Sequence, residues 1–412
     1  MATEKIKEEE EMDIMSFLND VRNNYPDAIS MASGRPDGKD FRMKEVLRYL
    51  LDDLHTGSAE EQEAKETLLG QYNSTKGIIA DHLVKYYNND YNLNIKAEDL
   101  VLTVGAQEAM MLCIEVFSKK GVVAFEDPSY VGFSNYAKLT GITAEAIAVD
   151  ETQTISLKAL EEKLIAGQKA SKPIRLLYVI PDFQNPTGAV MSYEKRCKLL
   201  ELAEEYDFHI FEDNAYRIFR YDGENVPTLF ELDQHARVIF VESFSKSVFP
   251  SIRMAALICK TEAIRKALIE LKGYVTVNTS VINQDLLKGV LANNGHSLIN
   301  FNAAKGESLR LKRDKLVEEI ERQRLNVPFE LKFRKPLGGF FMLLEFPFVL
   351  SNEDVKNAAE HFGIVFCLYS FFTAANEPQP FIRLSFSEIP LDKIEEGVDR
   401  LIKYLNHKYD TL

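Results

Sequence analysis

The chain has 412 residues, of which 46% are hydrophobic and 27% are charged, and these fractions are ordinary for a globular enzyme. This length exceeds what one hydrophobic core usually supports, so two domains are expected. The net charge of -14 argues against a nucleic-acid partner, because nucleic-acid binding needs a basic surface that displaces counterions. Any phosphate site is therefore expected to be a local patch of positive charge.

The cysteines, the N-terminal residues and the lengths of the apolar runs indicate the cellular compartment of the protein. The four cysteines are far apart and form no C-x-x-C pair, and no two histidines have zinc spacing, so neither a disulfide framework nor a metal site is indicated. The acidic start has no apolar core and is not Arg-rich, which argues against a secretory signal or a transit peptide. No apolar run is long enough to span a bilayer. The sequence thus predicts a soluble, cytoplasmic protein with no membrane partner.

From about residue 98, short apolar runs alternate with amphipathic stretches, a pattern typical of strands that connect through helices into a mainly parallel sheet. One connecting helix is clear, at Ser192–Tyr206, where Ser192 is a plausible N-cap. We therefore predict an α/β domain with a seven-stranded sheet flanked by helices. The expected strands are Leu100–Val104, Val122–Phe125, Ile142–Val149, Ile174–Ile180, His209–Glu212, Arg237–Val241 and Ala255–Cys259.

The pattern changes after Val281, where a long charged helical stretch runs from about Ser297 to Arg324. A smaller α+β domain is expected beyond it. Its predicted elements are a strand at Gly339–Glu345, a helix at Asn352–Phe362, a strand at Phe381–Phe386 and a helix at Leu391–Tyr404. We predict an N-terminal arm with part of the small domain at 1–50, a large domain at 51–296 and the small C-terminal domain at 297–412.

The segment from Ser243 to Arg253, S-F-S-K-S-V-F-P-S-I-R, follows an apolar strand. Open α/β sheets bind ligands at the carboxyl ends of their strands. Lys246 can form an imine with an aldehyde there, and two hydroxyls with a guanidinium can hold a phosphate. Pyridoxal 5'-phosphate carries both groups. A plain polar turn is the alternative, because short Ser/Lys/Arg clusters often arise by chance.

Other strand ends add matching groups. Gly105 lies in a turn before a helix that is expected to begin near Gln107, and exposed amides at a helix start bind phosphate. Asn185, in a Pro/Asn/Gly loop, has the chemistry to contact the cofactor's phenolic oxygen, although this loop is also good turn chemistry. Asp213 ends an apolar strand, where a carboxylate needs a cationic partner such as a pyridinium nitrogen. An N-cap role for Asp213 is an even alternative.

Two tyrosines lie beside these groups. Tyr216, three residues after Asp213, can reach the same phenolic oxygen. Tyr130 follows an apolar strand, and its ring can stack on a pyridine ring, although such a tyrosine more often lies at the edge of a core. Each feature has an ordinary explanation, but their succession at four strand ends favours one cofactor pocket, because a doubly wound sheet brings those ends to one rim.

From roughly Ile29 to the final helix, the chain resembles fold-type I pyridoxal-phosphate enzymes of the class I/II aminotransferase family, with an aspartate-aminotransferase-like fold. Within that family it is most similar to the kynurenine and 2-aminoadipate aminotransferase branch. The resemblance implies roles for the residues above: Lys246 as the Schiff-base lysine, Asp213 at the pyridine nitrogen, Asn185 and Tyr216 at the ring oxygen, Tyr130 stacked on the ring, and Gly105, Ala106, Gln107, Ser243, Ser245 and Arg253 around the phosphate.

The resemblance also implies a homodimer with shared active sites, because Tyr72 matches a tyrosine that reaches the neighbouring subunit's phosphate. Arg383 matches the arginine that binds the substrate α-carboxylate, with a surface arginine as the alternative. Gly34 and Asn185 are expected to contact the substrate.

Three regions depart from the family pattern. The loop Cys367–Phe372 lacks the usual Pro-Gly pair, and the acidic segment His55–Glu66 looks longer than usual. Arg35 stands where the branch often has an apolar residue, and we expect it to face water rather than a substrate side chain. These departures leave the amino donor, the acceptor and the pathway open.

The expected reaction moves an amino group from an L-amino acid to a 2-oxo acid by a ping-pong mechanism, with Lys246 carrying the α-proton. A lyase, decarboxylase or oxidase on the same scaffold is the alternative. A non-enzymatic ligand-sensing domain is disfavoured, because the chain is acidic and has no basic helix-turn-helix segment.

Overall fold

The computed structural model describes residues 14–412. In the region containing the predicted cofactor residues, seven strands form one sheet in the order β2-β8-β7-β6-β5-β3-β4. All are parallel to one another except β8, which runs antiparallel to both of its neighbours. The strands are β2 Leu100–Thr103, β3 Val122–Asp127, β4 Ala144–Ala148, β5 Ile174–Val179, β6 His209–Asp213, β7 Val238–Ser243 and β8 Ala255–Cys259. The predicted mainly parallel, seven-stranded sheet is confirmed.

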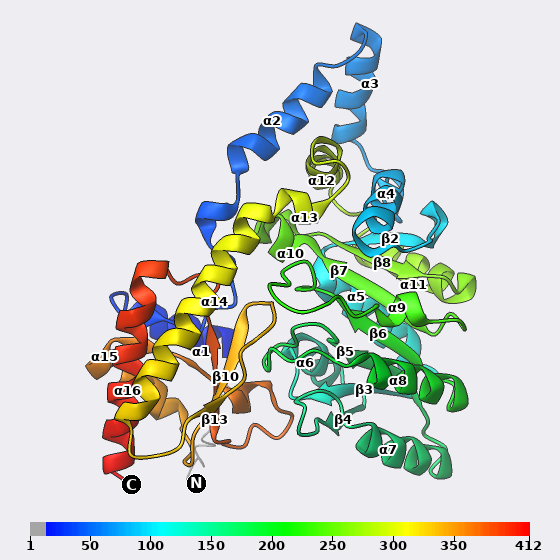
Figure 1. The fold of residues 1–412 in the computed structure, drawn as a ribbon. Helices are drawn as coiled ribbons and strands as arrows, with labels where there is room; N and C mark the ends of the chain where they lie inside the picture. Colours follow the sequence, from blue (N-terminus) through cyan, green and yellow to red (C-terminus); the bar gives the residue numbers. More distant parts are fainter. Residues whose placement is uncertain (1–13) are drawn as a thin grey trace, which may run out of the picture.

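Helices cover both faces of this sheet (Figure 1). Successive strand residues therefore enter opposite cores: Phe240 packs in one core, while Ile239 and Val241 pack in the other. This is why the strands read as continuous apolar runs. The helices of this region are α4 Ala80–Tyr91, α5 Gly105–Ser118, α6 Val131–Leu139, α7 Leu157–Lys169, α8 Tyr193–Glu205, α9 Leu229–Leu232, α11 Glu262–Val275 and α12 Val281–Asn293.

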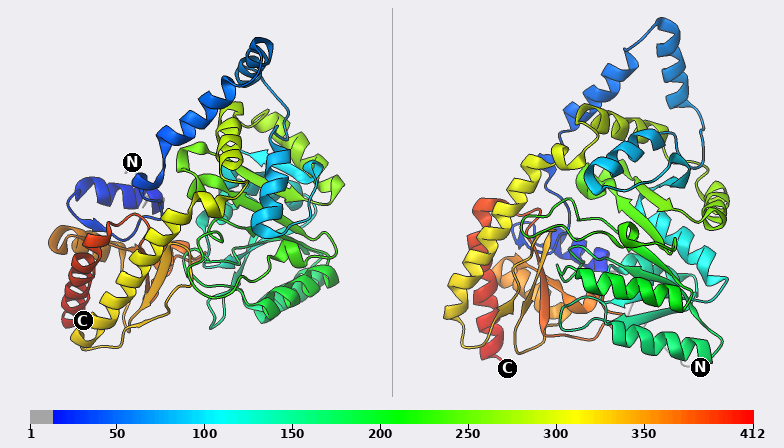
Figure 2. Two further views of the ribbon diagram at one scale, coloured as in Figure 1. Left: turned by 45° about the horizontal axis from the view of Figure 1, so that its top comes forward. Right: turned by 45° about the vertical axis from the view of Figure 1, so that its right-hand side comes forward.

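A smaller sheet lies next to the large one, and the long helices α14 and α16 pack against it (Figure 2). Its antiparallel strands have the order β12-β13-β10-β9, and a separate parallel pair joins β1 to β11. The N-terminal helix shares this core, because Phe17 and Val21 pack in the same cluster as Met342. The elements are α1 Ile14–Asn24, β1 Ile29–Ser30, α14 Ala303–Gln323, β9 Lys332–Phe333, β10 Phe341–Glu345, α15 Asn352–Phe362, β11 Ile364–Val365, β12 Cys367–Leu368, β13 Phe381–Ser385 and α16 Ile394–Asp410.

The structure differs from the predicted elements at several ends. The long charged stretch is two helices, α13 Leu298–Phe301 and α14, because Asn302 ends the first with its side-chain amide on the Leu298 carbonyl. The last helix starts at Ile394 and continues to Asp410. Helix α5 begins at Gly105 rather than near Gln107. No helix within residues 14–412 is long and apolar enough to cross a membrane. The domain boundaries stay a prediction.

The acidic segment His55–Glu66 contributes to a helical hairpin that projects from the top of the molecule (Figure 1). Helix α2, Met43–Leu54, packs against α12, and α3, Ala59–Gly70, returns alongside. Ser58 starts α3 with a capping box in which its hydroxyl accepts from Glu61 and the Glu61 carboxylate accepts from Ser58. The segment is therefore a turn at residues 55–58 followed by helix from Ala59 onward.

Candidate active site

A cavity of about 550 Å³ opens at the carboxyl ends of the large sheet's strands, with walls from both sheets and from α1. Twelve of the residues singled out from sequence line it, although they are scattered over most of the chain. They are Gly34, Ala106, Gln107, Tyr130, Asn185, Asp213, Tyr216, Ser243, Ser245, Lys246, Arg253 and Arg383. Gly105 and Tyr72, which were also singled out, lie outside its lining.

Lys246 projects into the cavity from a one-turn helix, α10 Phe244–Ser247, that follows β7 directly. The Ser243 hydroxyl caps this helix by accepting from the Ser245 amide. The Lys246 amine donates to the Gly34 carbonyl at 2.8 Å. Burial, with the nearby positive charge of Arg383, lowers the pKa of Lys246 to about 8. A substantial share of this amine is therefore neutral near pH 8, as a nucleophile or base requires.

Asp213 ends β6 and is buried, with its carboxylate beside the cavity. Its Oδ2 accepts from the Tyr178 hydroxyl at 2.7 Å, whereas its Oδ1 is buried without a hydrogen-bond partner among the described residues. Burial raises the pKa of Asp213 to about 6. A buried, unsatisfied oxygen is costly, so this position fits a ligand that brings a cationic N–H.

Arg383, on β13, meets Asn185 across the cavity floor. Its Nη1 donates to the Asn185 Oδ1 at 2.8 Å, and its Nη2 donates to the Ala32 carbonyl. The guanidinium lies over the rings of Phe341 and Phe372, with its carbon 4.3 and 4.6 Å from their centroids. These contacts fix the plane of the arginine fork, which is the geometry needed to bind a carboxylate.

The residues predicted to surround a phosphate form a cup between α5 and α10. Gly105 has φ +72°, and a Cβ built there would come within 2.9 Å of an Arg253 nitrogen, so the arginine lies directly against its backbone. The Ser245 hydroxyl is buried with no hydrogen-bond partner in the described chain. An unsatisfied hydroxyl, a guanidinium and the first amides of α5 together suit a phosphate group.

The two predicted tyrosines take different environments. Tyr216 is buried and packs edge-on against Phe340 and Phe341, with centroid distances of 5.2 and 5.5 Å, and burial raises its pKa. Tyr130 caps the start of α6, is partly exposed and lines the cavity. Its ring is therefore placed where a ligand's ring can lie against it.

The structure shows where the residues that depart from the family pattern lie. Phe372 lines the cavity, whereas Tyr369 is buried beside it and donates to the Gln153 side chain at 3.5 Å. Arg35 is exposed at the edge of the cavity, and one of its nitrogens donates to Asn19 at 3.4 Å. The side chain of Tyr72 is 83% exposed on this chain.

Two contributors were missed by sequence reasoning: Tyr178 and Phe341. Tyr178 is a strand residue within an apolar run, so only its hydroxyl marked it as more than core. Phe341 packs under Arg383, and a Cβ added to Gly34 would come within 2.7 Å of its ring. No local signal in the sequence brings these residues together.

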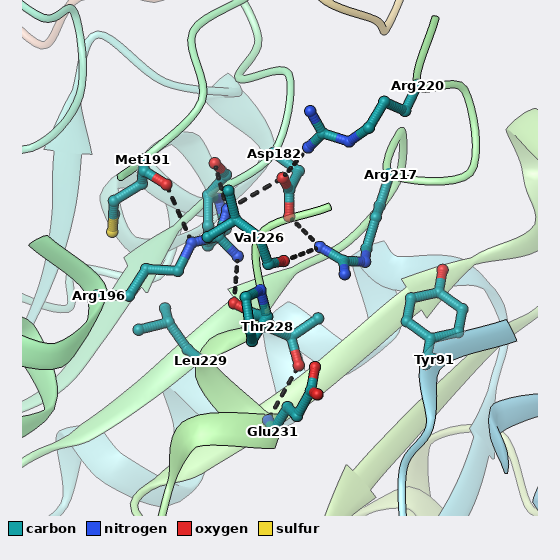
Figure 3. A network of polar contacts seen from close by, with 12 residues as sticks. Tyr91, Asp182, Met191, Arg196, Arg217, Arg220, Val226, Thr228, Leu229 and Glu231 are labelled. Atoms are coloured by element: carbon teal, nitrogen blue, oxygen red, sulfur yellow. Dashed lines mark hydrogen bonds and ion pairs between the residues drawn. The ribbon is translucent and has the colours of Figure 1, made fainter. Parts of the chain in front are cut away.

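A buried ionic cluster supports the loops that carry Asn185 and Tyr216 (Figure 3). Asp182 accepts from Arg196, Arg217 and Arg220, each at 3.0 Å. Arg196 also donates to the carbonyls of Met191, Pro227 and Pro181. Because Asp182 lies three residues before Asn185 and Arg217 follows Tyr216, the cluster joins both segments to α8.

Comparison with known proteins identifies the family. The family model for aminotransferase class I and II matches residues 26–401. The chain belongs to this family. The aminotransferase is 35% identical over 404 residues to the (S)-3,5-dihydroxyphenylglycine transaminase of Amycolatopsis orientalis, an alignment that covers 94% of this chain and 90% of the relative.

Two solved structures show how far the fold is shared. The kynurenine aminotransferase of Pyrococcus horikoshii, solved with PMP and with kynurenine, aligns with a TM-score of 0.83 at 28% identity over 96% of this chain and 94% of its own. The α-aminoadipate aminotransferase of Thermus thermophilus, solved with N-(5'-phosphopyridoxyl)-L-leucine, aligns with a TM-score of 0.80 at 27% identity over 95% and 96%. The predicted branch and the aspartate-aminotransferase-like fold are confirmed.

The protein is therefore a pyridoxal-phosphate-dependent aminotransferase that acts on an amino acid and a 2-oxo acid. The cavity fits this cofactor on its own geometry. The unpartnered Asp213 oxygen suits a protonated ring nitrogen, and the unpartnered Ser245 hydroxyl beside Arg253 suits the phosphate.

Proposed function

We propose that the aminotransferase carries out its reaction with Lys246 as both the cofactor anchor and the proton carrier. The observation that supports this most is the placement of a buried amine, the unpartnered Asp213 oxygen and the Arg383 fork around one cavity. When bound, pyridoxal phosphate supplies an aldehyde that reacts with amines and a ring that withdraws electrons from the substrate's Cα.

The proposed cofactor contacts follow from the cavity walls. Asp213 Oδ1 holds the ring nitrogen in its protonated form, while Asn185 and Tyr216 contact the ring oxygen and Tyr130 covers one ring face. Ser243, Ser245, Arg253 and the turn at Gly105–Gln107 bind the phosphate. Tyr72 completes the phosphate site of a second subunit.

The proposed substrate contacts place the reacting carbon beside Lys246. Arg383 binds the α-carboxylate, with Asn185 fixing the orientation of its guanidinium. Gly34 contributes the backbone carbonyl that holds the Lys246 amine at 2.8 Å. With a substrate bound, Lys246 would move the proton that leaves the substrate's Cα.

The outer part of the cavity points to the class of amino donor. Leu18, Val131, Leu139 and Phe372 line it with apolar side chains, and the exposed Arg22 and Arg35 lie at its edge. We infer that the donor has a large apolar or aromatic side chain, because such a side chain buries the most surface here. A polar group at its far end would lie near the two arginines.

An assay with amino acids, run with and without a 2-oxo acid, tests these proposals. We expect large apolar and aromatic donors to convert the cofactor to its aminated form, and a 2-oxo acid to restore the original absorbance. Turnover should require both substrates. Release of ammonia, carbon dioxide or hydrogen peroxide in the absence of a 2-oxo acid would instead favour a lyase, a decarboxylase or an oxidase.

A homodimer is the proposed assembly. Helix α2 exposes an apolar row, with Met43, Leu47 and Leu51 at four-residue spacing and 38, 45 and 52% exposed. The exposed Tyr72 lies on the same hairpin region. A second copy covering this row would explain both features. The cytoplasm is the proposed compartment, supported by four cysteines that are all unpaired.

A further inference from the structure

The carbonyl of Lys246 lies at the end of a short helix that provides no backbone N–H to hydrogen-bond with it. Helix α10 spans only Phe244–Ser247, and the residue four positions after Lys246 is Pro250. Proline has no backbone N–H, so the hydrogen bond that would continue the helix from this carbonyl cannot form. The carbonyl therefore needs a donor from elsewhere in the fold.

Lys305, on α14, supplies that donor. Its amine donates to the Lys246 carbonyl, although the two residues are 59 positions apart. Lys305 is 5% exposed and lies outside the cavity lining, so its contact is with the backbone of Lys246 and not with the cavity. A hydrogen bond with a charged donor is among the stronger ones in proteins.

The surroundings of Lys305 explain how an ammonium group is kept there. Its nitrogen lies 5.2 Å from the centroid of the Phe219 ring, a cation–π contact. Asp40, on the N-terminal segment, attracts its charge, while burial lowers the pKa of Lys305 to about 8. Burying an amine is costly, so its retention beside the anchor lysine needs an explanation beyond packing.

Helix α14 also contacts the N-terminal segment whose backbone accepts a hydrogen bond from the side-chain amine of Lys246. Lys312, two turns after Lys305, donates to the Asp37 carboxylate and to the Ser387 carbonyl, both at 3.1 Å. Gly34, three residues before Asp37, accepts from the Lys246 amine. Helix α14 thus contacts the backbone of Lys246 through Lys305 and the N-terminal segment through Lys312.

We infer that Lys305 is a positioning residue for the aminotransferase reaction: its ammonium fixes the backbone carbonyl of Lys246 and so holds the reactive amine in register with the cofactor pocket. The inference rests on the proposed role of Lys246 as the anchor. Lys305 itself touches neither substrate nor cofactor.

The test compares Lys305→Met with Lys305→Arg in the cofactor-loaded enzyme. We expect Lys305→Met to weaken cofactor binding about tenfold and to lower kcat at least tenfold with little change in KM, because the Lys246 carbonyl loses its donor. The pH midpoint of the cofactor's visible absorbance should rise, because a positive charge near Lys246 is removed. Lys305→Arg keeps a charged donor and should recover most of each property.

Arg313→Met is the matched control, since it removes another buried cation from the same helix, one that contacts the Pro336 carbonyl and Asp222 rather than Lys246 or the segment around Gly34. We expect it to lower the melting temperature at least as much as Lys305→Met while leaving the absorbance midpoint and cofactor affinity unchanged. An unchanged midpoint and kcat in Lys305→Met would overturn the inference. Equal losses of kcat and cofactor affinity in Arg313→Met would also overturn it, because the effect would then come from a weakened α14.

A separate measurement distinguishes failure of this inference from failure of the proposed anchor. Reduction of the loaded enzyme with borohydride, followed by peptide mass spectrometry, identifies the lysine attached to the cofactor. Labelling of Lys246 supports the anchor whatever Lys305→Met does. Labelling of a different lysine would reject both proposals.

Discussion

Single buried groups set the chemistry of this aminotransferase, and Asp213 is the clearest case. One carboxylate oxygen is held by Tyr178, and the other is left for the cofactor. The two oxygens therefore have separable tasks, orientation by the first and contact with a cation by the second. Each task can be removed without the other.

Asp213→Asn should lower kcat by about 100-fold or more, because a neutral amide no longer favours protonation of the ring nitrogen. Cofactor affinity should fall much less, since the phosphate contacts are untouched. Steady-state kinetics and a cofactor titration measure both effects. Tyr178→Phe is the control and should cost about tenfold or less, because it removes one hydrogen bond. Equal turnover in Asp213→Asn and the unaltered enzyme would contradict the assignment.

Glu126, at the end of β3, gives a prediction about pH. Its Oε1 accepts from the Ile180 amide at 2.7 Å, and its Oε2 is buried without a hydrogen-bond partner within residues 14–412. Burial raises the pKa of Glu126 from 4.5 to about 8. Between these values the folded chain keeps a proton that the unfolded chain has released, so the free energy of unfolding falls as pH rises through this range.

Glu126→Gln should remove this contribution, because an amide has the same shape and does not ionise. The free energy of unfolding, measured with urea from about pH 4.5 to 8, should fall less steeply with pH in the variant. Glu212 and Glu242 also have raised pKa values, both about 7, so the difference between the two proteins is the quantity to compare. Parallel pH profiles would show that Glu126 is ionised in the folded state.

At the scale of elements, the cluster around Asp182 joins α8 to the two loops beside the cofactor pocket (Figure 3). Arg196 is fully buried and reaches three backbone carbonyls as well as Asp182, whereas Arg220 is partly exposed and stacks on Phe183 with its guanidinium carbon 4.8 Å from the ring centroid. The two arginines share a partner but differ in how much structure depends on them.

Arg196→Met should destabilise the fold by about 3–5 kcal/mol, because it leaves buried carbonyls and part of the Asp182 charge unpaired. Arg220→Met should cost much less, because the other two arginines still neutralise Asp182 and water reaches the vacated position. Thermal unfolding of both variants at one pH provides the comparison. A larger loss for Arg220→Met would mean that the loop, and not α8, is the element this cluster holds.

On the scale of the whole molecule, residues from both sheets and from α1 enclose the cavity. The α2–α3 hairpin projects away from the rest of the chain (Figures 1 and 2). Tyr72 is not part of this cavity's lining on its own chain and is exposed. The proposed dimer gives the projection and the exposed tyrosine a common purpose.

Mixing two inactive variants tests that purpose. If Tyr72 serves the partner's site, combining Tyr72→Ala with Lys246→Ala subunits should restore activity, because the mixed dimer contains one site with both residues intact. About a quarter of the normal activity is expected when the two variants mix freely in equal amounts. Leu47→Glu should shift the mass in sedimentation from two chains to one. Activity that is absent from the mixture despite exchange would place Tyr72 outside the shared site.

Much of this architecture can be predicted from local sequence patterns. The strands of the large sheet are buried on both faces, so their apolar runs predict β6 and β7 as buried parallel strands. Asp213 and Lys246 were predicted at the carboxyl ends of these strands from that pattern. The class of cofactor followed from the same strand ends. The break between α13 and α14 at Asn302 could not be predicted, because the residues on either side continue the same helical pattern.

The sequence by itself determined which chemical group follows each strand, the cofactor class and the family, because these predictions rest on local motifs and their order along the chain. Only the tertiary structure decided which groups meet. Arg383 and Asn185 are 198 residues apart, and Lys305 reaches the Lys246 backbone from another sheet's helix. Such pairings depend on how whole elements pack, and a hydrogen bond between distant residues leaves no periodic trace in either segment.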